Sequence, residues 1–144
     1  MAALIFTLNR DYLTQAYVEQ FHELAYSFGV DDLVLVSRIC GPIRGIRNYA
    51  GQRFVVVPDW ETALEVLEHP AADRFVFLED NGTDLPGVTY PERPVFVLGD
   101  DKAGLPVNPT GENIVARIPV LKPRNLWSQQ AAAIVLSDWY SKAG

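Results

Sequence analysis

The feature that most constrains the fold of this 144-residue chain is a set of short, continuous apolar segments. Strands with one face in water alternate apolar and polar residues, whereas strands buried on both faces do not. These segments therefore predict an α/β fold, in which helices cover both faces of a mostly parallel sheet. The predicted strands are residues 4–8, 33–36, 54–57, 75–78, 95–98 and 114–120.

Three other stretches have the residue spacing of helices. The first begins near Asp11, which is a suitable N-cap, and ends at Gly29. The second begins at Asp59 and ends before Pro70, and the third is residues 126–142. Helices alternating with strands are the pattern expected for a parallel sheet.

Length and composition predict one globular domain, residues 1–144. No apolar run approaches the roughly 20 residues that span a bilayer, so no membrane contact is expected. The first residues lack the basic segment of a signal peptide and are predicted to form a strand, which favours a cytoplasmic location. Cys40 is the sole cysteine, which excludes an intrachain disulfide and a multi-cysteine zinc site. No metal site is predicted.

The net charge of −6 argues against general attraction of the surface to nucleic acid, and DNA binding is not expected. The basic residues are unevenly distributed, however. Four arginines and no acid lie between residues 38 and 53: Arg38, Arg44, Arg47 and Arg53. This stretch is either a solvated loop or a local patch that binds RNA phosphates.

The last predicted helix is apolar almost all round. Residues 131–136 leave no polar face over more than one turn, and Trp139 and Tyr140 extend the apolar surface. A helix of this kind must be buried on all sides. One side can pack on the sheet, and a second copy of the chain is the natural cover for the other. A homodimer is therefore expected.

Two segments near the C-terminus, residues 94–106 and 116–136, join a predicted strand to a glycine- or proline-rich turn. The spacing of Gly99 and Gly104 is that of a phosphate loop, but Leu105 and Pro106 follow where Lys and Ser/Thr are required. No G-x-G-x-x-G dinucleotide fingerprint occurs. The isolated residues His22 and His69 are predicted to be structural.

Together the two segments resemble motifs of the SpoU (TrmH-like) branch of the SPOUT superfamily of RNA methyltransferases. Residues 98–105, Leu-Gly-Asp-Asp-Lys-Ala-Gly-Leu, are similar to the branch motif Leu/Phe-Gly-x-Glu-x-x-Gly-Leu. Residues 118–120, Ile-Pro-Val, and 124–136 are similar to an Ile-Pro-Met strand that leads into Arg-Ser-Leu-Asn-Leu-Ser-Asn-Ala-Val-Ala-Ile-Val-Leu. The resemblance covers essentially the whole chain.

This resemblance implies a C-terminal deep trefoil knot, a dimer through the terminal helices, and S-adenosylmethionine bound in the knot. The backbone of two glycines allows close approach of a ligand, and apolar side chains supply walls for adenine. The loop of residues 78–82 is expected to close the third side. The predicted cofactor-binding residues are Leu78, Leu98, Gly99, Gly104, Ile118, Val120 and Leu126.

The implied reaction is ribose 2′-O-methylation of RNA, with tRNA as one candidate substrate. Members that methylate ribose carry an arginine in the first helix, where this chain has Glu23. The predicted replacements in the catalytic machinery are Asn9, Arg10 and Arg44, with Arg47 as a further candidate. Arg124, the one retained motif arginine, is predicted to bind RNA phosphate or an acidic group of the fold.

Two alternatives remain open at the level of sequence. Trp127 and Gln130 replace motif asparagines, and together with Glu23 they favour a catalytically degenerate dimer that binds cofactor or RNA, or other proteins. The acidic charge favours methylation of a different acceptor. Asp100 and Asp101 are interpreted either as a solvated turn or as a paired acid or metal site.

Overall fold

A six-stranded β-sheet forms the centre of the computed structural model, which describes residues 2–7, 15–37, 51–99, 104–121, 126 and 128–143. The strand order is β3-β2-β1-β5-β4-β6, and every pairing between these strands is parallel. The predicted α/β class with a parallel sheet is therefore confirmed. The strands are β1 (Ala3–Thr7), β2 (Asp32–Val36), β3 (Arg53–Val57), β4 (Phe75–Asp84), β5 (Val95–Leu98) and β6 (Ile114–Arg117).

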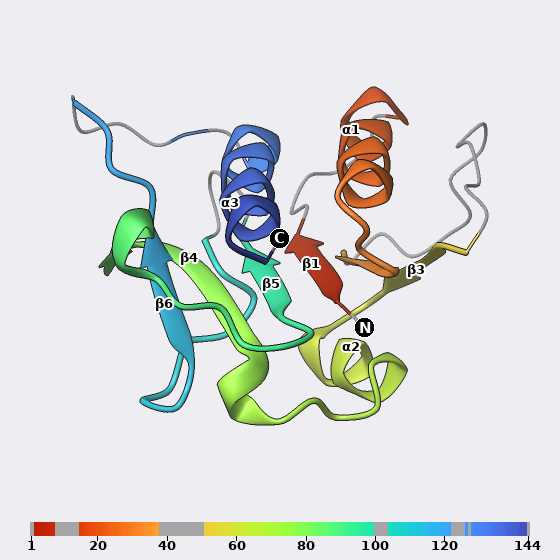
Figure 1. Cartoon of the computed structure of the whole chain (residues 1–144). Coiled ribbons are helices and arrows are strands. Elements are labelled where there is room, and N and C mark those ends of the chain that lie inside the picture. Colours follow the sequence, from red (N-terminus) through yellow and green to blue (C-terminus); the bar gives the residue numbers. More distant parts are fainter. Residues whose placement is uncertain are drawn as a thin grey trace.

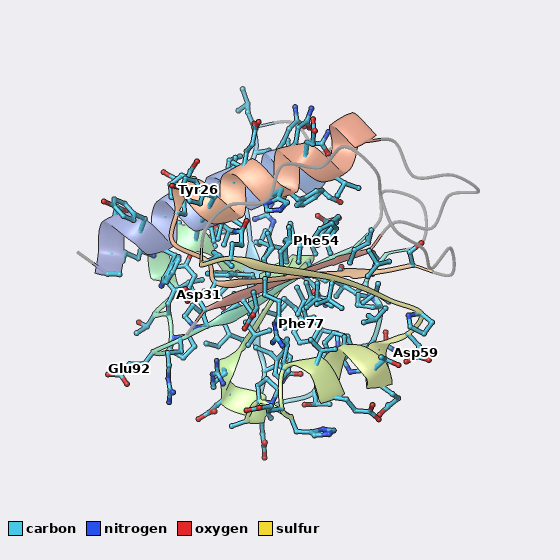
Figure 2. All side chains as sticks on the ribbon, turned by 90° about the vertical axis from the view of Figure 1, so that its right-hand side faces the viewer. Tyr26, Asp31, Phe54, Asp59, Phe77 and Glu92 are labelled. Carbon is cyan, nitrogen blue, oxygen red and sulfur yellow. The ribbon has the colours of Figure 1, made fainter. Side chains whose placement is uncertain are left out.

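Helices cover both faces of the sheet. Figure 1 shows α1 (Gln15–Ser27) and α3 (Ser128–Ala143) side by side on one face, with α2 (Trp60–Val66) on the other. In Figure 2 the sheet is seen edge-on, with Phe54 on the α1 and α3 side and Phe77 on the α2 side. None of the helices in the described ranges is both long and apolar enough to cross a membrane.

The continuous apolar strands follow from this layering. Successive residues of β1 point to opposite faces, so Leu4 and Phe6 enter one core cluster while Ile5 enters the other. On the first face the ring of Phe6 stacks on Phe21 of α1, with 4.1 Å between ring centroids. Because helices cover both faces of the sheet, β1 is buried along its whole length and carries apolar residues on both faces.

Local interactions explain where two of the helices begin or end. Asp59 caps α2 as predicted, because its carboxylate accepts hydrogen bonds from the backbone N–H and the hydroxyl of Thr62, at 2.8 and 2.7 Å. These bonds hold the pKa of Asp59 below its usual value. Gly29 follows α1 with φ of 73°, in the left-handed region that favours glycine.

Two strands, β4 and β6, end more than one residue away from the predicted end. β4 continues past Leu78 to Asp84, through a polar stretch that has the composition of a turn. Its pairing with β6 shifts between Leu78 and Thr83, both of which pair with Ala116. β6 ends at Arg117 rather than at residue 120, and Pro119 beyond it has no backbone N–H to donate.

A hydrogen-bonded cluster fastens the end of α3 to the chain after β4. Lys142 donates from Nζ to the carbonyl oxygens of Leu85 and Val88, at 2.6 and 2.9 Å. The same ammonium pairs with Asp138 at 2.9 Å, and Asp138 accepts a bond of 2.7 Å from the hydroxyl of Tyr90. The last two turns of the helix are thereby fixed against the sheet.

Candidate functional site

A cavity of about 230 Å³ lies where β5 and β6 end and α3 begins, beside residues 78–80 in the middle of β4. Ligand sites of open parallel sheets are found outside the carboxyl ends of the strands, which is this edge of the sheet. Segments far apart in the sequence line the cavity. Its lining residues are Leu78, Glu79, Asp80, Leu98, Gly99, Gly104, Leu105, Ala116, Ile118, Leu126, Ser128 and Ala131.

Branched apolar side chains make up much of the wall. They come from the strands, from the segments that follow them and from the start of α3, and they include Leu78, Leu98, Leu105, Ile118 and Leu126. Two alanines, Ala116 and Ala131, leave room between them. Such a wall suits a flat, weakly polar ring system.

Bare backbone forms another part of the cavity. The chain at Gly99 approaches Gly104 so closely that a Cβ atom on Gly99 would lie 2.4 Å from the carbonyl carbon and oxygen of Gly104. Only glycine fits there. Gly104 itself has φ of 74°, which also favours glycine. Both residues therefore present peptide groups, without side chains, to the cavity.

Ser128 connects α3 to this backbone. It is the first residue of α3, its side chain is only 5% exposed, and its hydroxyl donates a hydrogen bond to the carbonyl oxygen of Gly99. This bond joins the end of β5 to the start of the helix, and it fixes the separation between two sides of the cavity.

Two carboxylates, Glu79 and Asp80, are the only ionisable side chains among the described residues that line the cavity. Glu79 is half-buried and Asp80 exposed, and neither forms a hydrogen bond or ion pair within the described ranges. In those same ranges no group of three His, Cys, Asp or Glu side chains is arranged to hold a metal ion.

Six of the seven predicted cofactor-binding residues lie around this cavity, and Val120 does not line it. Extended backbone would place Val120 on the same side as Ile118, but β6 has already ended at Arg117. The sequence prediction missed Leu105, Ala116, Ser128 and Ala131. Of these four, Ser128 could have been predicted from the sequence, because it is a polar residue within the second motif segment, residues 116–136.

Arg53 is the one predicted RNA-binding residue that the structure describes. It begins β3, at the opposite edge of the sheet from the cavity, and pairs with Asp32 at 2.8 Å. It also donates to the carbonyl oxygen of Val66 at 3.0 Å. Several residues that the sequence analysis singles out lie outside the described ranges. They include Asn9, Arg10, Asp11, Arg38, Arg44, Arg47, Asp100, Asp101, Arg124 and Trp127.

A groove of about 400 Å³ lies between α1 and α3, lined by residues of both helices. Two apolar residues, Leu24 and Ala133, line it together with five polar or charged ones, Gln20, Glu23, Ser27, Gln129 and Gln130. Nearby, Ile134 is 40% exposed, and Tyr140 is 64% exposed. The exposed side of α3 thus carries the apolar residues Ile134 and Tyr140 together with polar residues such as Gln130 and Ser137.

His22 is a buried residue of α1, as expected for a structural histidine. Its ring meets that of Phe54 edge-on, with 5.5 Å between centroids. His69 follows α2 with φ of 51° and is exposed. Neither lines the cavity.

Solved structures similar to the chain are SpoU and related methyltransferases. The SpoU methyltransferase AviRb from Streptomyces viridochromogenes, in complex with AdoMet, superposes with a TM-score of 0.75 at 14% identity. The AdoMet-bound rRNA methyltransferase from Sinorhizobium meliloti gives 0.75 at 20% identity. A structure described for 2-OH methylation of C/U34 on tRNA gives 0.72 at 19% identity. The chain has the SpoU methyltransferase fold.

The SpoU-type fold extends over 98% of the chain in the first two comparisons and 99% in the third. The chain spans 60% and 56% of the length of the first two proteins and 92% of the third. The sequence matches no protein-family model and no curated protein. The trefoil knot stays a prediction, because residues 100–103 and 122–125 lie outside the described ranges.

Proposed function

We propose that this chain is an S-adenosylmethionine-dependent RNA methyltransferase that modifies a ribose 2′-hydroxyl, with tRNA as a candidate substrate. One observation carries the proposal. The cavity beside residues 78–80 of β4 and the carboxyl ends of β5 and β6 combines apolar side chains with bare glycine backbone, in a fold whose solved examples include AdoMet-bound methyltransferases.

The residues around the cavity fit this cofactor. Leu78, Leu98 and Ile118 offer apolar contacts to an adenine ring, while the peptide groups of Gly99 and Gly104 offer donors and acceptors to its polar edge. When bound, the cofactor supplies an electrophilic methyl group. Its reaction with an acceptor hydroxyl would leave S-adenosylhomocysteine, and the hydroxyl proton would pass to solvent.

The distribution of charge supports an RNA substrate. Seven of the twelve basic residues lie in the segments that follow β1, β2, β5 and β6: Arg10, Arg38, Arg44, Arg47, Lys102, Lys122 and Arg124. Those segments leave the sheet at the edge that holds the cavity. Basic residues gathered in a few segments of an acidic protein attract phosphates locally. Arg53, at the other edge, instead joins β3 to β2 and α2.

For catalysis we propose Asn9, Arg10 and Arg44, which follow β1 and β2 in the sequence. Their role is to hold the acceptor hydroxyl in line with the methyl group and to stabilise the oxygen as its proton leaves. In-line transfer requires the ribose hydroxyl to be held in one position. Contacts of Arg38, Arg47 and Arg124 with RNA phosphates would hold the RNA in that position, so they contribute to the rate of methyl transfer as well as to the affinity for RNA.

We further propose that two copies associate through the groove between α1 and α3. Ile134 and Tyr140 on α3 and Tyr26 on α1, the last 53% exposed, supply apolar surface on that side. A two-fold axis would bring the same surface of each copy together.

A second function is favoured by Glu23. Glu23 stands at the sequence position where the resemblance expects a catalytic arginine. It is exposed on α1 and lines the α1–α3 groove rather than the cavity. The alternative is a dimer that binds cofactor or RNA without transferring a methyl group.

Methyl transfer to RNA from a strain lacking the gene separates these functions. The purified protein is incubated with this RNA and methyl-labelled S-adenosylmethionine, and the RNA is digested for nucleoside mass spectrometry. We expect one 2′-O-methylated nucleoside to gain label. A folded protein that binds the cofactor but incorporates no label would support the non-catalytic alternative.

A further inference from the structure

Glu79 and Asp80 give the described part of the cavity lining a net negative charge. They extend from the part of β4 that passes the cavity, where its pairing with β6 is irregular. Carboxylates carry a negative charge at neutral pH. No other described lining residue is ionisable, so no cation of the described lining neutralises them.

The two carboxylates are also unengaged in the fold. Two other described acids do form ion pairs: Asp32 pairs with Arg53 at 2.8 Å, and Asp84 pairs with Arg117 at 2.9 Å. Glu79 and Asp80 lie close in sequence to Asp84 but form no bond within the described ranges. They are thus free to interact with a positively charged ligand in the cavity.

We propose that Glu79 and Asp80 make this cavity selective for cationic ligands, so that the sulfonium cofactor binds more tightly than its neutral thioether product. This inference rests on the proposed function. S-adenosylmethionine carries one positive charge more than S-adenosylhomocysteine, and the two molecules share the adenine, ribose and amino-acid groups. Attraction of the carboxylates to the sulfonium therefore strengthens the binding of S-adenosylmethionine alone. It favours release of S-adenosylhomocysteine after methyl transfer.

The size of the effect is limited by exposure to solvent. An exposed ion pair changes an affinity by roughly two- to fivefold, so two carboxylates predict a preference of about tenfold for the cation. Because the charges are near the surface, raising the ionic strength from about 0.02 M to about 0.5 M is expected to reduce this preference.

Calorimetry with three probes tests the selectivity. S-adenosylmethionine and sinefungin are cationic at the position where S-adenosylhomocysteine is neutral, since an ammonium group of sinefungin replaces the sulfonium. For the wild type we expect both cations to bind about tenfold more tightly than the thioether. In Glu79→Gln with Asp80→Asn, only the two cations should weaken. Glu65→Gln on α2, the same change away from the cavity, should keep the preference.

The outcomes separate the two proposals. If the double variant weakens all three ligands equally, the carboxylates bind the shared ribose or ammonium group, and the charge selectivity is overturned. Equal affinity of the wild type for the three ligands would overturn it as well. If the folded wild type binds none of them, the methyltransferase function itself is contradicted.

Discussion

The hydroxyl of Ser128 donates a hydrogen bond to the carbonyl oxygen of Gly99, and this bond couples the start of α3 to the end of β5. Ser128→Ala removes the donor and leaves the carbonyl oxygen without its side-chain partner. We expect a loss of about 1 kcal/mol in the free energy of unfolding and a weaker affinity for S-adenosylmethionine.

Chemical denaturation and calorimetry measure the two effects. Ser137→Ala is the matched control, because Ser137 is exposed on the same helix and does not line the cavity. An unchanged affinity in a folded Ser128→Ala protein would show that the bond does not position the cavity.

Close backbone approach at Gly99 predicts a strong dependence on glycine. In Gly99→Ala the new Cβ would lie 2.4 Å from backbone atoms of Gly104, so one of the two segments must move. We expect a loss of about 2 kcal/mol or more in stability, together with impaired cofactor binding. In Gly111→Ala the added Cβ meets no atom within 4 Å, and stability should change by less than about 0.5 kcal/mol. Equal unfolding midpoints for the two variants would refute the close approach.

Tyr90 makes stability depend on pH in the alkaline range. Burial, followed by the bond to Asp138, raises the pKa of its hydroxyl above the ordinary value of 10.0. The folded protein therefore keeps this proton where the unfolded chain releases it. The resulting stabilisation is fully present below about pH 10 and declines as the pH rises further.

Tyr90→Phe should therefore show a shallower loss of stability above about pH 10 than the wild type. Urea denaturation over a series of alkaline buffers measures the slope. Tyr140→Phe, at an exposed tyrosine whose ring contact with Phe28 remains possible, is the control. Parallel pH profiles for wild type and Tyr90→Phe would argue against an effect of Tyr90.

The α1–α3 groove predicts a dimer that a single charge can disrupt. Ala133→Arg places a large charged side chain in this groove, and we expect a shift from dimer to monomer in analytical ultracentrifugation. Ala71→Arg makes the same change at an exposed site before β4 and should leave the dimer intact. A wild-type protein that is monomeric at micromolar concentration would contradict the proposed interface.

The sequence predicted the layers of the fold because burial on both faces requires continuous apolar strands, as in β1 and β5. It did not predict the length of β4. Residues Glu79 to Gly82 have the composition of a turn, yet they remain in the strand, where a Cβ on Gly82 would lie 2.6 Å from the backbone of Val115. Contact with a strand distant in sequence decided this conformation, and local propensity could not reveal it.

Part of the candidate site, like part of the fold, could be predicted from the sequence. Glycines and large apolar residues in the motif segments marked five lining positions, and the expected loop after the fourth strand marked a sixth, Leu78. Ala116 and Ala131 were not distinguishable from core residues, because a small apolar side chain has the same pattern in a core and in a cavity wall. The strand order, which brings β4, β5 and β6 to one edge, was needed to identify them.

Calorimetric binding of S-adenosylmethionine to the wild type and to Ala131→Met tests the central claim most directly. Ala131 lines the cavity from α3, and a methionine there would occupy part of its space; Ala143→Met, at the exposed end of the same helix, is the control. We expect one cofactor per chain in the wild type and control, and an affinity lower by roughly tenfold or more in Ala131→Met at similar thermal stability. Absence of binding to the folded wild type, or equal binding by all three proteins, would contradict the assignment of this cavity as the cofactor site.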